Sequence, residues 1–197
     1  RLVKEGKMPP SILVMPDTFT SMGGNQYIDS QIMGNWGTWL KEDLIRELNA
    51  RYKISGFGLV GKSSGGYGSL VRGMLDDCWS AIACHSGDCG FELLFGIEMA
   101  ATLTQISIAG GESSFLENIR TSKSIKGDDF HSLMILAMAA TYSDGSLPVD
   151  ERGVFDDEKW ADWKSWDPLV MIETHQKLPQ CWIDVGNADQ YNIQYLS

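Results

Sequence analysis

A serine with a glycine two residues away on either side is the pattern in this sequence that most directly indicates chemistry. Residues 61–65 read Gly-Lys-Ser-Ser-Gly and have the form G-x-S-x-G. In a nucleophile elbow of this form the serine occupies a sharp, strained turn between a strand and a helix, which leaves room only for small residues at the two glycine positions. The hydroxyl would then stand at the carboxyl edge of a sheet, with the N–H of Ser64 and the positive end of the helix directed at a developing oxyanion. The pattern therefore predicts Ser63 as a nucleophile and Ser64 as an oxyanion donor.

The same stretch also matches a phosphate-binding loop, G-x-x-x-x-G-K-[ST], over residues 56–63. Such a loop needs a strand before its first glycine, and residues 52–55, Tyr-Lys-Ile-Ser, are too few and too polar for a central strand. The apolar residues between 57 and 60 fit a strand better than a loop around a phosphate. A hydrophobic strand that ends in Asp184 could supply a magnesium-side aspartate, so the phosphate loop stays open as the alternative to the favoured elbow.

The elements that would position these residues alternate between strand and helix. Strands are predicted over residues 11–15, 57–61, 79–84 and 181–185, and helices over residues 36–52 and 64–77. This alternation is typical of a parallel sheet with right-handed crossovers. We therefore expect an α/β fold of the hydrolase type, a parallel sheet flanked by helices.

A stretch of helical character interrupts that alternation. Residues 91–108 and 131–142 are predicted helices within it, and Asp167-Pro168 after it supplies an N-cap and a first-turn proline for a short helix. We interpret residues 88–166 as a helical cap inserted into a core made of residues 1–87 and 167–197.

Composition excludes several classes of protein. Sixteen Lys and Arg against 26 Asp and Glu give a net charge of −10, the wrong sign for a protein that binds phosphate backbones. The longest apolar runs, such as residues 12–15 and 134–140, are far shorter than the roughly 20 residues that span a bilayer. The four cysteines have no C-x-x-C spacing, which favours free and mostly buried thiols over a zinc site, with a Cys84–Cys89 disulfide as the minor alternative. We therefore expect no nucleic-acid partner, no membrane span and no metal.

The elbow is one of several blocks that together resemble a known family. The blocks are residues 15–17, 23–27 with Ser30, 61–68, 84–88, 136–143, 166–168 and 184–192. They resemble the esterase family of the α/β-hydrolase fold that includes S-formylglutathione hydrolase (esterase D), enterochelin esterases and the secreted mycolyl transferases. The resemblance spans nearly the whole chain.

What the resemblance implies is a Ser–His–Asp hydrolase in the chain order Ser, Asp, His. Ser63 matches the nucleophile and Asp189 matches the triad acid, while Asp184 is the less favoured carboxylate. The family's histidine position and the strand whose loop gives the second oxyanion N–H have no counterpart in this sequence. The resemblance thus implies a chain that is incomplete at both ends.

Three further residues are candidates for the site. His85 ends a predicted strand on the same rim as Ser63, and we favour a pocket wall or a structural role for it over a catalytic base. Asn25 and Tyr27 follow the carboxyl end of the first predicted strand, where ligands bind in open α/β sheets. For Asn25 and Tyr27, substrate contact and loop architecture are both open.

Together these features predict a serine carboxylic-ester hydrolase, or an acyl transferase that uses the same acyl-enzyme, acting on a small-molecule ester without a metal or organic cofactor. The alternative from another class is a non-catalytic fragment or binding module on a hydrolase scaffold. A sheet that lacks a central strand exposes strand edges and apolar surface, so we also expect a second copy or a neighbouring chain to cover them.

Overall fold

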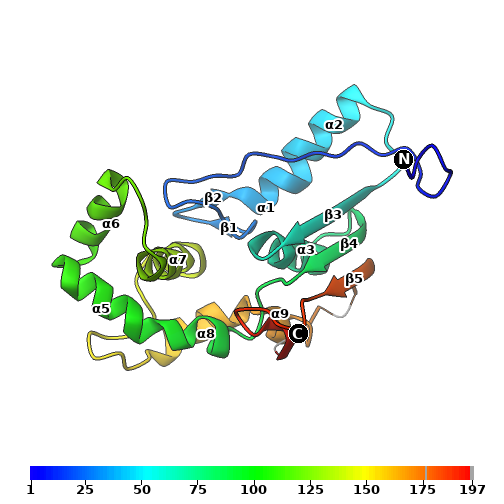
Figure 1. Ribbon diagram of the computed structural model, residues 1–197. Coiled ribbons are helices and arrows are strands. Elements are labelled where there is room, and N and C mark those ends of the chain that lie inside the picture. The colour runs from blue at the N-terminus through cyan, green and yellow to red at the C-terminus, as the bar shows by residue number, and fades with distance from the viewer. Residues whose placement is uncertain (176, 196–197) are drawn as a thin grey trace.

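The computed structural model describes residues 1–175 and 177–195 and has a mixed α/β arrangement (Figure 1). Its main sheet is parallel, with the strands β3 (Phe57–Lys62), β4 (Trp79–His85) and β5 (Gln180–Asp184) in that order. Gly61 pairs with Cys84, and Cys84 pairs with Ile183. The helix α3 (Ser64–Leu75) connects β3 to β4. The predicted strands at 57–61, 79–84 and 181–185 and the parallel pairing are therefore confirmed.

The strand predicted over residues 11–15 is wrong. These residues form no ladder, and the side chains of Leu13 and Met15 are 73% and 83% exposed. The run has the composition of a buried strand, but a strand exists only where a neighbour completes its hydrogen bonds, and no described strand lies alongside it. The chain then forms a small antiparallel hairpin from β1 (Asp29–Ser30) and β2 (Gly34–Asn35).

The helix predicted over residues 36–52 is confirmed as a run of three joined pieces. They are α1 (Trp36–Thr38), the π-helical η1 (Trp39–Leu44) and α2 (Ile45–Arg51). The i+4 spacing of its apolar residues predicted the helical run, but spacing does not distinguish a π-helical segment from an α-helical one.

Helices fill the region between β4 and β5. They are α4 (Phe91–Leu94), the 3-10 turn η2 (Gly96–Glu98), α5 (Met99–Ala109), α6 (Glu112–Thr121), α7 (Gly127–Tyr142), α8 (Asp157–Ser165) and α9 (Pro168–Met171), and a further 3-10 turn η3 (Ile193–Tyr195) follows β5. Helices α5, α6 and α7 form a lobe away from the sheet (Figure 1). Asp167 caps α9 as predicted, accepting a hydrogen bond from the N–H of Leu169 at 3.1 Å.

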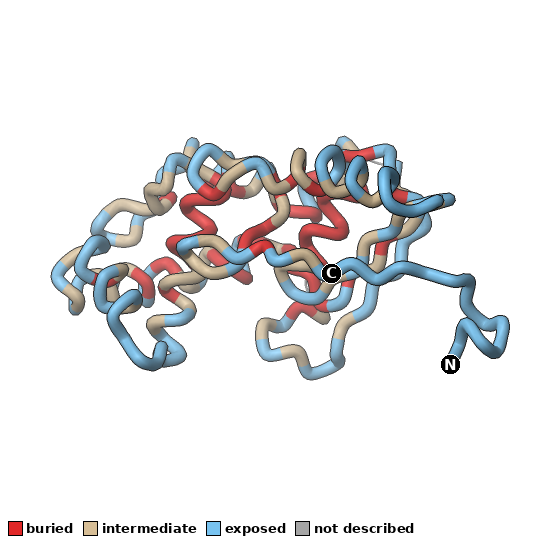
Figure 2. The backbone as a smooth tube through the Cα atoms, turned by 90° about the horizontal axis from the view of Figure 1, so that it is seen from above, coloured by how far each residue is buried: buried red, intermediate tan, exposed pale blue. Residues whose placement is uncertain are grey.

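Two clusters of buried side chains hold these parts together, and Figure 2 shows along the backbone where the buried residues lie. The larger is rich in aromatic residues and joins α3 to the helices that follow β4, through Tyr67, Phe91 and Trp163. The smaller lies between α3 and the sheet and consists of Leu70, Trp79, Ile82 and Cys84. Because α3 contributes to both clusters, its position is fixed from two sides.

One helical run among the described residues, Phe91–Ala109, is long and apolar enough by length and composition to cross a membrane. It is broken by the 3-10 turn η2 and carries Glu92 and Glu98. It also buries Phe91, Phe95 and Met99 in the larger cluster. A single run of this kind, broken by a turn and packed into the larger cluster at its N-terminal half, is consistent with the expectation of no membrane span.

All four cysteines are free, so the structure does not contain the alternative Cys84–Cys89 disulfide. Cys84 and Cys89 are buried, whereas Cys78 and Cys181 are exposed, so the prediction of mostly buried thiols holds for only half of them. Burial raises the pKa of Cys84 to about 11 and that of Cys89 to about 12. Both buried thiols are therefore neutral and unreactive at physiological pH.

Candidate functional site

The turn between β3 and α3 has the geometry of a nucleophile elbow. Ser63 adopts φ 55° and ψ −126°, a strained conformation for a residue with a side chain, and it is exposed. Its N–H donates to the carbonyl of His85 at 3.0 Å, and its carbonyl accepts from the N–H of Tyr67 at 2.9 Å. The backbone on both sides of the turn is thus held, and the strained residue presents its side chain to solvent.

The motif predicts that both of its glycines are needed for steric reasons, but the structure requires only one of them to be glycine. A Cβ atom at Gly61 would lie 2.1 Å from the carbonyl carbon of Gly65, a contact that the backbone cannot accommodate. A Cβ atom at Gly65 would meet nothing within 4 Å. Only Gly61 is therefore required for the close approach of strand and helix.

Ser64 is the first residue of α3. The first four N–H groups of a helix have no acceptor within the helix, and they lie at the positive end of its dipole. The backbone N–H of Ser64, one residue after Ser63, is therefore placed where a donor to an oxyanion is expected.

The phosphate-loop alternative requires residues 56–63 to form a loop, but Phe57–Lys62 is β3, the first strand of the sheet. Its backbone N–H groups are arranged along a strand and cannot converge on a phosphate. The local structure therefore favours the elbow.

Beneath the elbow lies a buried carboxyl group, that of Asp88. Its Oδ2 atom accepts a hydrogen bond from Nε2 of Gln26 at 3.0 Å and a longer one from Oγ of Ser64 at 3.5 Å. Burial raises the pKa of Asp88 to about 6, the two hydrogen bonds oppose this, and the charge of Asp189 adds to it. Asp189 is half-buried in the loop after β5 and accepts from the N–H of Tyr191 at 2.9 Å. Asp88 is thus hydrogen-bonded to the elbow through Ser64 and interacts electrostatically with Asp189, the expected triad acid.

His85 lies at the same edge of the sheet but is engaged elsewhere. It is paired with Lys62 in the sheet on one side and with Asp184 on the other. Its Nδ1 atom contacts a carboxylate oxygen of Asp184, and this hydrogen bond lowers the pKa of Asp184. Both side chains are about half exposed, at 49% and 48%. Asp184, the less favoured triad acid, is therefore the partner of His85.

No histidine among residues 1–175 and 177–195 forms a hydrogen bond with the hydroxyl of Ser63. His131 lies 3.8 Å from a carboxylate oxygen of Glu98, and Nδ1 of His175 lies 3.1 Å from the carbonyl of Met171. The described histidines thus interact with groups other than the Ser63 hydroxyl.

Asn25 and Tyr27 shape the loop that runs beside α3. Asn25 is buried, and its side chain donates to the carbonyl of Thr18 at 2.6 Å and accepts from the N–H of Tyr27 at 2.7 Å. Tyr27 has φ 59°, and its ring packs so closely on Gly68 that a Cβ there would lie 2.5 Å from it. Both polar groups of the Asn25 side chain form hydrogen bonds within the loop, so Asn25 has a structural role there. Tyr27 also borders a cavity.

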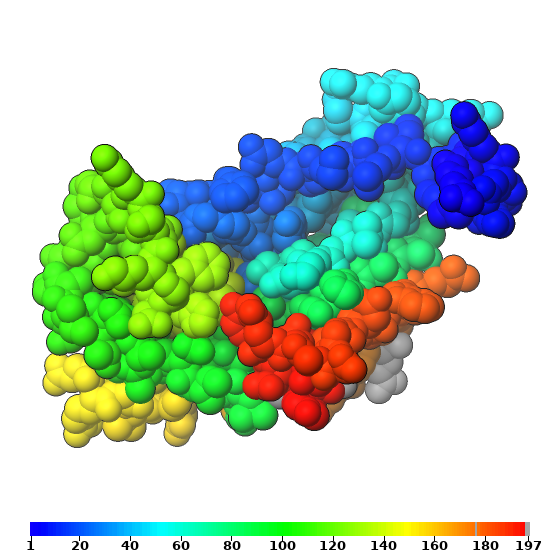
Figure 3. Space-filling view, viewed as in Figure 1, coloured from blue at the N-terminus to red at the C-terminus, as the bar shows by residue number. Residues whose placement is uncertain are grey.

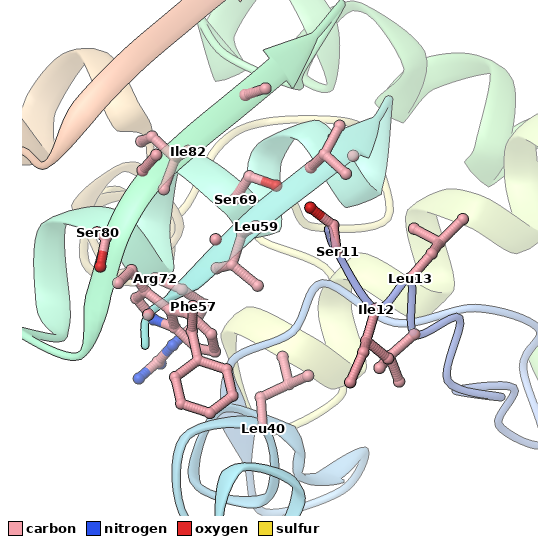
Figure 4. Close-up of a pocket in the computed structure, with 18 of the residues that line it drawn as sticks. Ser11, Ile12, Leu13, Leu40, Phe57, Leu59, Ser69, Arg72, Ser80 and Ile82 are labelled. Atoms are coloured by element: carbon pink, nitrogen blue, oxygen red, sulfur yellow. The ribbon is translucent and has the colours of Figure 1, made fainter. Parts of the chain in front are cut away.

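That cavity is large, about 1330 Å³, and is lined by residues of β3, β4 and β5 together with the N-terminal segment. The N-terminal segment passes over it, leaving a hollow between that segment and the sheet (Figure 3). Leu13 of the N-terminal segment, Leu40 of η1, and Phe57 and Leu59 of β3 line it (Figure 4). The cavity reaches Lys62 and Gly65 but not Ser63. The predicted exposure of strand edges and apolar surface is therefore confirmed at β3.

The buried contact between Gln26 and Asp88 was not identified from the sequence. Both residues belong to blocks that carry the family resemblance, but nothing in their spacing shows that a carboxyl 62 positions away is buried against the Gln26 amide.

No protein-family model matches this chain, and no curated protein matches it. The site is thus defined by its own geometry.

Proposed function

We propose that this chain carries the nucleophile of a serine carboxylic-ester hydrolase, or of an acyl transferase that works through the same acyl-enzyme. The observation that carries the proposal is the elbow: an exposed serine at φ 55°, between a parallel strand and a helix, over a glycine that no other residue can replace. Strained φ/ψ values persist where the surrounding structure enforces them, and they cluster at active sites. The resemblance of several sequence blocks to the esterase family adds to this support.

In the proposed reaction the Ser63 hydroxyl attacks the ester carbonyl carbon while a base takes its proton. The N–H of Ser64 donates to the carbonyl oxygen as it becomes an oxyanion. The C–O bond to the leaving alcohol then breaks, and the alcohol receives the proton from the base. Water, or a second alcohol in a transferase, attacks the acyl-enzyme and releases Ser63 by the same steps in reverse.

The base is assigned to a histidine outside this sequence, with Asp189 as the residue that orients it. The half-buried carboxylate of Asp189, in the loop after β5, supports this part of the proposal. His85 is not assigned as the base, because its Nδ1 atom is paired with Asp184.

A fluorophosphonate probe tests the proposal, because it phosphonylates only serines that are activated as nucleophiles. In the full-length protein the probe should label Ser63, and Ser63→Ala should abolish the labelling. Ser80→Ala is the matched control, since Ser80 is an exposed serine of β4 outside the elbow. Absence of labelling in a folded protein would refute the proposal.

The second candidate is a non-catalytic binding module on the same scaffold. The observation that favours it is that no described histidine reaches Ser63. Ester hydrolysis by this chain alone, above background and lost in Ser63→Ala, would exclude it. Labelling that occurs only in the full-length protein would instead agree with the assignment of the base to a residue outside this sequence.

A further inference from the structure

Asp88 is a buried acidic group that the reaction proposed above does not use. It is 9% exposed, and its oxygen accepts hydrogen bonds from Gln26 and Ser64. These three residues, which we call the Asp88 cluster, come from the loop before β1, the start of α3 and the loop after β4. The cluster thus joins three segments directly beneath the elbow.

The Asp88 cluster contains two features that lower the stability of the folded state. No Lys, Arg or His among residues 1–175 and 177–195 contacts the carboxylate, and a buried charge without a cation is costly. The side chain of Gln26 is 1% exposed, and its Oε1 atom has no hydrogen-bond partner among these residues. An apolar residue at position 88 would avoid the buried charge, so the arrangement calls for a functional explanation.

From this geometry we infer that Asp88 is a positioning residue, which orients the N–H of Ser64 toward the oxyanion by accepting hydrogen bonds from the Ser64 hydroxyl and the Gln26 amide. The inference rests on the proposed function, because it assigns a task at the same elbow. The hydroxyl of Ser64 connects the first turn of α3 to Asp88, and the Nε2 atom of Gln26, which also lies 3.0 Å from Sδ of Met138, connects the loop before β1 to the same carboxylate oxygen.

Charge and hydrogen bonding at Asp88 have separate effects. Both donors approach the same oxygen, Oδ2, so a neutral Asn side chain can accept from both of them with its amide oxygen. The charged form, however, places a negative charge below the group that must stabilise an oxyanion. Asp88 should therefore support the reaction through its oxygen and oppose it through its charge.

Labelling of Ser63 by the fluorophosphonate probe in the full-length protein separates these effects. Asp88→Leu removes the acceptor and should slow labelling by about tenfold or more, because small displacements of groups in an active site have effects of this size. Asp88→Asn should stay within about threefold of wild type at pH 5, as a conservative rescue.

The ratio of the Asp88→Asn rate to the wild-type rate should then rise with pH, with a midpoint near pH 6, because burial raises the pKa of Asp88 to about 6. Taking the ratio cancels the titration of the catalytic base, which both proteins share. The other titratable groups that act on Asp88 are Asp189 after β5, Tyr67 of α3, Tyr142 of α7 and the thiols of Cys84 and Cys89. The two tyrosines and two thiols have raised pKa values and stay neutral over this range.

Circular dichroism decides whether each variant folds. If Asp88→Leu does not fold, Ser64→Ala replaces it, since this change removes the hydroxyl but keeps the backbone N–H, and it should slow labelling severalfold. Wild-type labelling rates in a folded Asp88→Leu or Ser64→Ala protein, or a rate ratio that is flat from pH 5 to 8, would overturn the inference while Ser63 remains labelled. Failure of the wild-type protein to be labelled would overturn the proposed function and this inference together.

Discussion

The two faces of the sheet β3–β4–β5 are built from alternate residues of the same strands, yet their surroundings are opposite. On the face covered by α3, Ile82 and Cys84 are 3% and 2% exposed. On the other face, Val60 and Trp182 are 73% and 68% exposed. Parallel sheets are normally covered on both faces. The difference shows that the described chain packs against the sheet from the α3 side and leaves the other side exposed.

The tightest point of the covered side is Gly61, and Gly61→Ala should have the largest effect on the molecule. Its new Cβ atom would lie 2.1 Å from the backbone of Gly65, so strand and helix would have to separate. We expect a loss of about 5 kcal/mol or more in the free energy of unfolding. Urea unfolding measures the loss, and the fluorophosphonate probe should no longer label Ser63.

Gly65→Ala is the matched control, because a Cβ at Gly65 meets nothing within 4 Å and alanine is favoured over glycine in a helix by up to about 1 kcal/mol. The variant should be as stable as wild type or more so. Equal losses in the two variants would contradict the asymmetry between the glycines.

The next largest loss of stability is expected on the covered face of the sheet, and a matched substitution on the open face provides the comparison. Ile82→Ala removes a buried side chain from the cluster between α3 and the sheet and should cost about 2 to 5 kcal/mol. Val60→Ala removes an exposed side chain from the adjacent strand and should cost less than about 1 kcal/mol. Urea unfolding of the two variants of this chain gives the comparison.

The outcome for Val60 also tests whether the open face is covered in solution. A cost for Val60→Ala close to that for Ile82→Ala would mean that a second copy or a neighbouring chain buries this face. Repeating the measurement over a range of protein concentrations distinguishes the two, because only self-association makes the cost depend on the concentration of this chain.

The same contrast explains which parts could be predicted from the sequence. The strands at 57–61 and 79–84 and the elbow between them were predicted because each depends on local composition and on nearby glycines. The apolar run at 11–15 has the same composition but no partner strand, so its local pattern was misleading. Helices α6 and α8 were missed because they contain many polar residues and bury only Phe115, and only Trp160 and Trp163, respectively. The Asp88 cluster was missed because it depends on contacts between residues far apart in the chain.

The smallest and most specific effect concerns two carboxyl groups, one buried beneath the elbow and one exposed at the end of β5. Asp88, buried beneath the elbow, has a pKa raised from 3.8 to about 6 by burial. Because the folded state keeps this proton where the unfolded state has lost it, the free energy of unfolding should fall by about 2 kcal/mol as the pH rises from 4 to 7. Asp88→Asn should remove this decrease, as measured by urea unfolding at each pH.

Asp184, on the open face, provides the matched control with the opposite sign. Its hydrogen bond with His85 lowers its pKa, so its contribution to stability is present above its ordinary pKa of 3.8 and is lost as the pH falls through the lowered value. Asp184 is exposed and screened by solvent, so Asp184→Asn should leave the decrease between pH 4 and 7 in place. If instead Asp184→Asn abolished the decrease and Asp88→Asn did not, the carboxylate that lowers stability would lie on the open face of the sheet. The contrast between a tightly packed elbow and an open face would then be wrong.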